Sequence, residues 1–501
     1  MITTSEGTAP PPVRSADSQE TTRSAPFSTS VTITVLVVGC TLLEVALSPL
    51  GQPRITFLVG AVLLSAFFLQ AHLDFVIWGI LGLSLALSPA MTSTAFESPL
   101  RVYYGDLVLL PAFAIGILVA LRRGGRAHFQ KHFVAILGFA MVWTALGTAR
   151  GLNLMDAVGV ARRVAVYPTI FVVASAAFHW NALRLSTFKQ VTTAAGIVVA
   201  IIGFSRLANV HGFAHALFEQ ADQTLHFLAY AECPAAVLAL FVVVGDMLRE
   251  RTKLVRRGLF ATAMFGVLVA SNYRTVWAAA LIALLTWMLA SRWRVARAMK
   301  YALLAVVAGG ALGAGFFVLA PESRTIQRFS ADNLRRGTEW RTGSWRRALE
   351  VVADHPITGT GFGYQHTFQY RTGPNFDRVQ VAKNTVHNDV LWILTNGGLL
   401  GALIILGFHA RWVRRVWRAL RSGRRDERHG VAAAILATYV FAGVICLVQP
   451  LFSDPGPIVS ISLLMAIALH VVDGLSLTTT TRDSAAESTN LQTARSEGGA
   501  S

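Results

Sequence analysis

The chain has 501 residues, of which 53% are hydrophobic and only 14% are charged, whereas a soluble domain carries roughly a quarter charged residues. This composition excludes an ordinary soluble protein and predicts an all-α, polytopic transmembrane helix bundle. The formal net charge of +17 does not indicate a nucleic-acid partner, because the basic residues gather between apolar segments and no soluble binding module accompanies them. Membrane topology is the better explanation of the charge.

The two ends of the chain are predicted to be disordered tails. Residues 1–30 are rich in Ser, Thr, Pro and Ala and have almost no large apolar side chains, so they cannot bury enough surface to fold. Residues 474–501 form the second tail. The first apolar run, residues 31–50, follows no basic segment and has no clear cleavage site, so we expect a retained membrane anchor.

Apolar stretches long enough to cross a bilayer recur along the rest of the chain, since a hydrocarbon core of about 30 Å needs roughly 20 apolar residues. They divide into a bundle over residues 31–320 and C-terminal helices over 389–473. Because several stretches are short or closely paired, the prediction is 12 to 14 spans, with fourteen as the working number. The spans are expected near 31–50, 55–71, 73–90, 106–121, 132–148, 160–178, 187–204, 224–247, 258–271, 274–290, 300–320, 389–409, 431–450 and 455–473.

Orientation follows from the distribution of basic residues, which accumulate on the cytoplasmic side. With the N-terminus inside, the inside segments hold 27 of the 44 basic residues, and ten of the other 17 lie in the long segment 321–388. We therefore expect both termini in the cytoplasm and segment 321–388 outside it. Arginine outnumbers lysine 39 to 5, which favours a GC-rich genome and hence the cytoplasmic (inner) membrane of a bacterium.

Segment 321–388 is the one large polar loop and the predicted place of any chemistry. Its ten basic and six acidic residues give a local net charge of +4, which suits an anionic ligand. Trp345, Leu349 and Val352 share a helical face, after which Pro356 and a glycine-rich run break the pattern. The loop should therefore contain short helices, including a short amphipathic helix lying on the membrane surface.

The end of this loop places a titratable imidazole, His387, at the outer end of a span. A histidine at that boundary can accept a proton from an alcohol near neutral pH, and Asn388 or Asp389 could fix its tautomer. Taken alone, the same histidine could equally cap the helix. The residues around it distinguish the two interpretations.

Three groups of residues, in this order along the chain, resemble the O-antigen ligase and polymerase family. They are Ser271 and Arg274 at the outer end of a span; Arg341 and Trp345 followed by Pro356, Gly359, Gly361 and Gly363; and His387, Asn388, Leu391, Gly398 and Gly401. In the family the Ser and Arg of the first group are more often adjacent. The resemblance covers roughly residues 258–405.

This resemblance implies a GT-C-like glycosyltransferase that moves a glycan from a polyprenyl-diphosphate carrier to a hydroxyl of a glycan or glycolipid acceptor. Arg274 and Arg341 would hold the leaving diphosphate, since guanidinium binds its oxygens bidentately. His387 would take the proton of the attacking hydroxyl in an inverting displacement. No metal and no cofactor is implied, and the remaining partners are membrane lipids.

Purely structural or anchoring roles are the alternatives to these assignments. Arg274 could extend to the membrane interface, and Arg341 could be a solvated loop charge. Arg346 and Arg347 could bind substrate or lipid headgroups, and Arg162 and Arg163 could bind a carrier phosphate or anchor their span. His211 and His215 have metal-ligand spacing but no third ligand, so no metal is expected there. Glu44 and Glu232 fall within predicted spans, where a carboxyl group is usually functional or paired.

Three functions remain to be compared. The motifs do not separate a ligase from a repeat-unit polymerase. A transporter or flippase of lipid-linked sugars should show paired repeat halves with broken helices, and no such repeat is visible. A non-catalytic scaffold would not need two outward arginines and a histidine together.

Overall fold

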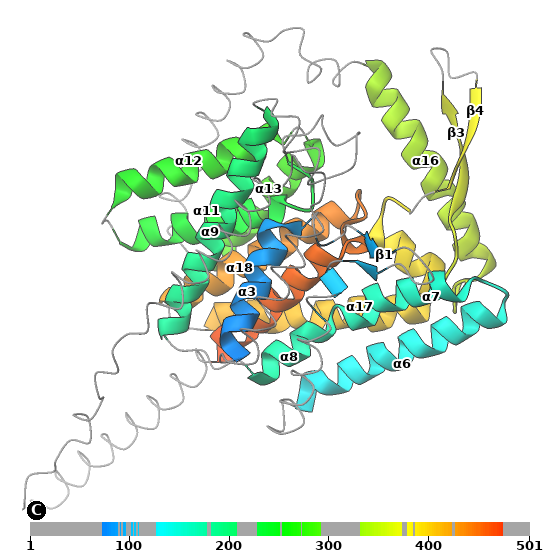
Figure 1. The fold of residues 1–501 in the computed structure, drawn as a ribbon, viewed down its shortest axis with the longest axis horizontal. Coiled ribbons are helices and arrows are strands. Elements are labelled where there is room, and N and C mark those ends of the chain that lie inside the picture. The colour runs from blue at the N-terminus through cyan, green and yellow to red at the C-terminus, as the bar shows by residue number, and fades with distance from the viewer. Residues whose placement is uncertain are drawn as a thin grey trace, which may run out of the picture.

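A computed structural model describes residues 73–88, 91, 94–96, 102–103, 105–106, 109, 127–177, 182–207, 228–250, 253–271, 273–291, 331–372, 378–383, 386–422 and 426–473 (Figure 1). Five of the described helices are long and apolar enough to cross a membrane. They are Leu185–Gly203 within α9 (Ala182–Leu207), Arg274–Ser291 (α13), Asp389–Ser422 (α17), Glu427–Cys446 (α18) and the C-terminal helix Pro455–Asp473. The predicted all-α polytopic bundle is confirmed.

The remaining helices overlap the predicted spans, and a small strand pair lies between two of them. They are α3 (Leu73–Ala86), α6 (Ala127–Ala149), α7 (Leu154–Ala161), the π-helical turn η2 (Arg162–Val166), α8 (Thr169–Ala177), α11 (Cys233–Arg249), α12 (Leu254–Ala270) and a small strand pair, β1 (Thr94–Phe96) with β2 (Val102–Tyr103). The span expected at 160–178 is divided between α7, η2 and α8. The spans expected at 31–50, 55–71 and 300–320, most of 106–121, and both tails lie outside the described residues.

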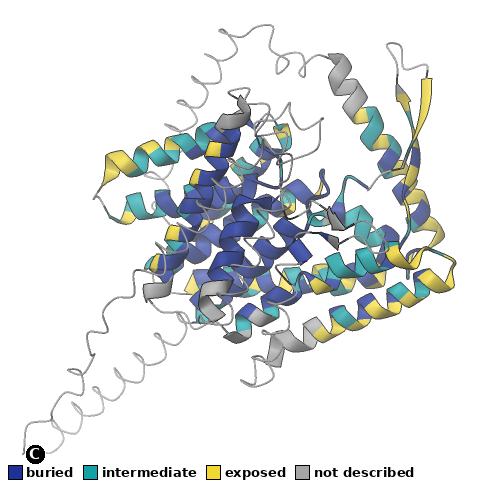
Figure 2. Ribbon diagram, viewed as in Figure 1, coloured by how far each residue is buried: buried dark blue, intermediate teal, exposed yellow. Residues whose placement is uncertain are grey.

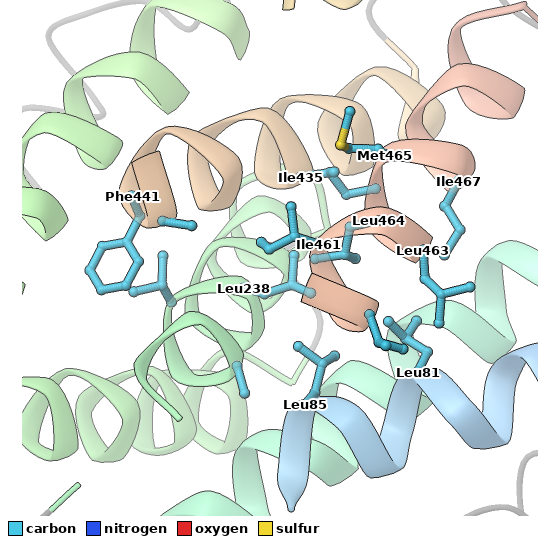
Figure 3. Packing of buried hydrophobic residues seen from close by; sticks show 14 of the residues in the cluster. Leu81, Leu85, Leu238, Ile435, Phe441, Ile461, Leu463, Leu464, Met465 and Ile467 are labelled. Atoms are coloured by element: carbon cyan, nitrogen blue, oxygen red, sulfur yellow. The ribbon is translucent and has the colours of Figure 1, made fainter. Parts of the chain in front are cut away.

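The core consists of helices that approach closely through small side chains. Ala279 and Ala283 of α13 and Ala433 of α18 are fully buried where these helices pack along each other. Small residues permit such close approach in membrane bundles. Figure 2 shows the burial concentrated at the centre of the molecule, and Figure 3 shows side chains of α3, α11, α18 and the C-terminal helix gathered in one apolar cluster.

Polar contacts assign the helix termini to two ends of the bundle. At one end, which we call the Lys189 end, Lys189 of α9 forms ion pairs with Asp246 of α11 and Glu427 of α18. At the other, the Tyr230 end, the Tyr230 hydroxyl donates to the Asp454 carboxylate at 3.5 Å. Tyr230 precedes α11 and Asp454 follows α18, so these two helices run from one end to the other.

The same reasoning places α13 and α17. His429 Nε2 lies 2.9 Å from the carbonyl oxygen of Ala290, so α13 finishes at the Lys189 end and Arg274, its first residue, lies at the Tyr230 end. The backbone N–H of Phe452 donates to Asp389 Oδ2 at 3.0 Å, so α17 also begins at the Tyr230 end. Arg274 and His387 therefore lie at the same end of the bundle.

The polar loop folds as one long helix and a hairpin. Helix α16 (Ala331–Asp354) has 24 residues, so the expectation of short helices was wrong in length. Strands β3 (Thr367–Thr372) and β4 (Arg378–Lys383) pair antiparallel in register from Thr367 opposite Lys383 to Thr372 opposite Arg378. Figure 1 shows the hairpin lying along α16, to one side of the central helices.

The face that α16 buries is shifted by one position from the predicted face. Ser344, Ala348 and Val351 are buried, whereas Leu349 is 56% exposed. The cause is close packing against the hairpin: a Cβ added to Gly343 would lie 2.5 Å from the carbonyl oxygen of Gln369 in β3. The closest approach of α16 to β3 is thus at Gly343, where a side chain would not fit.

Candidate functional site

The site is built where α16 meets the first turn of α17. His387 immediately precedes α17, and Asn388 caps it: its Oδ1 accepts the backbone N–H of Val390 at 2.9 Å and that of Leu391 at 3.0 Å. Such a cap satisfies backbone donors that have no partner within the helix. The Asn388 oxygen is therefore engaged by the helix, and its predicted substrate contact stays a prediction.

Two tryptophans of α16 hold His387. The ring centroids of Trp340 and His387 are 4.3 Å apart and nearly perpendicular. Trp345 Nε1 donates to the backbone carbonyl oxygen of His387 at 3.3 Å. Both tryptophans lie within four residues of Arg341, so His387 contacts the stretch of α16 that carries Arg341.

Arg341 is partly buried and lies close to Arg274, 67 positions earlier in the chain. Burial lowers the pKa of the Arg341 guanidinium, and the positive charge of Arg274 lowers it further. Arg341 Nε is buried without a hydrogen-bond partner, and in the described part of the chain no carboxylate pairs with Arg341. The fold thus brings two of the predicted cations together and leaves one of them uncompensated, a costly arrangement without an anion.

The glycine-rich turn after α16 is fixed on both sides. Trp143 Nε1 of α6 donates to the Thr358 carbonyl at 2.6 Å, and Nη1 of Arg150, which follows α6, donates to the Gly359 carbonyl at 2.6 Å. On α17, the N–H of Thr360 donates to the Thr395 carbonyl at 2.9 Å. The turn therefore ties the polar loop to the bundle beside the site.

Glycine is required at two points of this contact. Gly359 has φ +62° and Gly398, within α17, has φ +61°, a region that L side chains rarely adopt. A Cβ on Gly398 would also lie 2.3 Å from the carbonyl oxygen of Ile357. Gly398 therefore bends α17 and admits the turn at the same time. This explains why a glycine pattern follows the histidine in the sequence.

Arg162 and Arg163 lie in η2, and their surroundings differ. Arg162 forms an ion pair with Asp106 at 2.7 Å and its guanidinium covers the Tyr103 ring at 4.7 Å, so it is held by the protein itself. Arg163 Nη2 lies 3.4 Å from the Tyr103 hydroxyl, and its charge acts on the carboxylate of Asp454 at the Tyr230 end. The anchoring interpretation fits Arg162 better than the phosphate interpretation.

Arg346 and Arg347 are exposed on the outer side of α16. Arg347 pairs with Glu350 at 3.0 Å, an i, i+3 contact of the helix. Neither contact of His387 described above involves them, so their predicted role with substrate stays a prediction. Glu232, whose partner the sequence did not reveal, accepts the backbone N–H of Ala229 at 2.8 Å. Glu44, His211 and His215 lie outside the described residues.

Sequence reasoning missed Trp340, Trp143 of α6 and Arg150, which follows α6. A tryptophan next to Arg341 carries no spacing signal, and α6 lies about 200 positions before the turn that it holds. Asp389 was considered as a partner of the histidine, but its carboxylate accepts the N–H of Phe452. It joins the start of α17 to the turn after α18.

Comparison with known proteins agrees with these motifs. The family model described as O-antigen ligase matches residues 259–406. This segment belongs to the O-antigen ligase family. It contains Arg274, Arg341 and His387, whereas Arg162 and Arg163 lie outside the O-antigen ligase match. The resemblance read from the sequence is confirmed, and the chain is a multi-pass membrane protein of polysaccharide biosynthesis. No curated protein matches the chain.

Proposed function

We propose that this protein is a membrane glycosyltransferase of the O-antigen ligase type. It transfers a glycan from a polyprenyl-diphosphate carrier to an acceptor hydroxyl, with inversion and without a metal, on the outer face of the bacterial cytoplasmic membrane. The observation that carries the proposal is that Arg274 acts electrostatically on Arg341, whose neighbour Trp340 contacts His387, inside the segment that matches the O-antigen ligase family.

The two arginines suit the diphosphate of the donor. Bringing two guanidinium groups together costs free energy that a bound anion recovers, and burial of Arg341 strengthens its attraction for that anion. Guanidinium also keeps its proton and binds phosphate oxygens bidentately. As the sugar–oxygen bond breaks, the electron pair passes to the diphosphate, whose added negative charge Arg341 and Arg274 stabilise.

His387 suits the role of general base. The acceptor hydroxyl attacks the anomeric carbon of the donor sugar from the side opposite the diphosphate, and its proton passes to the imidazole. Trp340 and the bond from Trp345 restrict where the ring and backbone of His387 can lie. The new glycosidic bond forms as the old bond to phosphate breaks, so the configuration inverts.

The substitution His387→Ala tests the proposal. We expect the variant to insert and fold normally but to lose glycan transfer from a purified lipid-linked donor, by a factor of about 100 to 10,000 for loss of a general base. Control measurements are membrane insertion and thermal unfolding of the same sample. Transfer at the rate of the unmodified chain would rule out His387 as the base.

The alternative within the family is a repeat-unit polymerase. It uses the same donor chemistry, and the site geometry suits either acceptor. Deletion of the gene separates the two: loss of a polymerase leaves single repeat units on the carrier, and loss of a ligase leaves long chains. A flippase, the less favoured alternative, would leave unextended lipid-linked units on the inner face and would tolerate His387→Ala.

A further inference from the structure

Helix α17 continues well beyond its apolar part. It has 34 residues and bends at Gly398; the part after the bend, residues 399–422, corresponds to about 36 Å, whereas a hydrocarbon core is about 30 Å thick. Its last stretch, residues 411–422, contains five arginines and no acidic residue. The span expected near 389–409 thus continues as a helix to Ser422 at the Lys189 end.

The arginine-rich stretch has two distinct faces. Trp412, Val416 and Leu420 are fully buried. Four arginines are exposed and, at i, i+3, i+7 and i+10 spacing, lie along one line of the helix. We call them the arginine stripe: Arg411, Arg414, Arg418 and Arg421.

Contacts with the C-terminal helix give the depth of the stripe. Trp412 Nε1 donates to the carbonyl oxygen of Met465 at 3.0 Å, and Arg415 pairs with Asp473 at 2.7 Å. Asp473 is the last residue of that apolar, membrane-length helix. Arg415 therefore lies beside the end of an apolar span, and Arg418 and Arg421, which follow it in α17, run past that end to the depth expected for lipid headgroups.

Charge compensation distinguishes the stripe from its basic neighbours. Lys189, Arg249 and Arg257 at the same end are paired with carboxylates of α11, α18 and Glu250. Among the residues that the structure describes, no carboxylate pairs with Arg414, Arg418 or Arg421. Lys189, Arg249 and Arg257 thus have carboxylate partners, whereas these three arginines of the stripe are exposed.

We propose that the arginine stripe binds the headgroups of anionic phospholipids at the membrane surface of the Lys189 end. Guanidinium groups bind phosphate oxygens bidentately, and a row of them on a helix that emerges from the bilayer matches a layer of phosphates. A membrane is favoured over an acidic protein because the same helix is buried on its other face against an apolar span. The site is separate from the one proposed for glycan transfer.

Native mass spectrometry of the purified full-length chain, titrated with phosphatidylglycerol or phosphatidylcholine, tests the proposal. We expect the unmodified chain to prefer phosphatidylglycerol. The double substitution Arg418→Gln/Arg421→Gln should weaken phosphatidylglycerol binding about fivefold for each arginine, or about 30-fold in all, without changing phosphatidylcholine binding. Arg418→Lys/Arg421→Lys should keep most of the preference because the charge remains.

The matched control is Arg371→Gln/Arg378→Gln, which removes two exposed arginines from the hairpin at the opposite end. This control should change phosphatidylglycerol binding less than twofold. Equal losses in the two Gln variants would show that only overall charge matters and would overturn the proposal. So would the absence of a lipid preference together with loss of a co-purifying acidic protein, which would assign the stripe to a protein partner. Glycan transfer does not enter the measurement, so the result is independent of the proposed function.

Discussion

Gly361 lies so close to Gly147 that a Cβ added to Gly361 would be 2.6 Å from the Gly147 Cα. Gly361 also has φ +89°. Gly361→Ala should therefore lower the free energy of unfolding by on the order of 2 to 4 kcal/mol, since both a backbone contact and a strained conformation are affected. Thermal unfolding of the purified chain measures this loss.

Two alanine substitutions in α6 provide the comparison for this contact. A Cβ on Gly147 would lie 2.0 Å from the carbonyl oxygen of Phe362, whereas nothing lies within 4 Å of one on Gly138. Gly147→Ala should destabilise the chain, and Gly138→Ala should leave it unchanged or stabilise it by up to about 1 kcal/mol. Equal melting temperatures for both would contradict the close approach of α6 and the turn.

Replacement of Arg341 by lysine tests whether the site needs a guanidinium group or only a positive charge. The ammonium keeps the charge but cannot reproduce a bidentate contact with the diphosphate, so Arg341→Lys should lower kcat/KM for glycan transfer about 10- to 100-fold. The control is Arg371→Lys on the exposed side of β3, which should transfer glycan at an unchanged rate. An active Arg341→Lys enzyme would mean that a charge at this position is sufficient.

Substitution of Asn388 separates a helix cap from a substrate contact. Asn388→Ala should cost about 1 kcal/mol of stability through loss of the bonds to the first turn of α17. Asn388→Asp keeps an acceptor oxygen and should restore both stability and transfer. If Asp restored the melting temperature but not transfer, the side chain would have a further role with substrate.

Asp454 gives the stability of the protein a dependence on pH. Burial raises the pKa of its carboxyl group to about 6, and the charge of Arg163 opposes the shift. Since the unfolded pKa is about 3.9, the stabilisation by the protonated carboxyl group is complete below that pH and is lost as the pH rises through about 6, a change on the order of 3 kcal/mol. The melting temperature should therefore fall between about pH 4 and about pH 7.

The matched variant for this effect is Asp454→Asn, which resembles the neutral acid. Its melting temperature should depend less on pH over the same interval, and the unmodified chain should approach the variant at the acidic end. A parallel pH dependence in the two proteins would assign the effect to another group.

The sequence predicted those parts of the fold that depend on local pattern. Apolar runs located the described spans, because membrane helices must be apolar along their length. The hairpin was missed although its signal was present: Phe368 and Tyr370 alternate with polar residues in β3, and Val379 and Val381 do so in β4. This alternation is short and follows a strong helical pattern, so it gives only a weak signal for a strand.

The site could be predicted only in part. Motif order and topology placed Arg274, Arg341 and His387 on one side, but their mutual approach depends on how α16 lies over the bundle. The contacts of Trp340 and Trp345 with His387, and the face that α16 buries, depend on how α16 packs against β3. The helical periodicity of the sequence does not contain that information. The sequence left Arg162 open between a carrier phosphate and an anchor of its span, and its ion pair with Asp106 fits the anchor.

The glycine-rich turn has a consequence for how substrates reach the site. It is hydrogen-bonded to α6 through Phe362 and Thr358 and to α17 through Thr360 and Gly361. A swinging lid would have to break these bonds and separate the tightly packed glycines. We therefore expect this part of the loop to be a stationary wall of the site, so that any opening for substrate lies elsewhere.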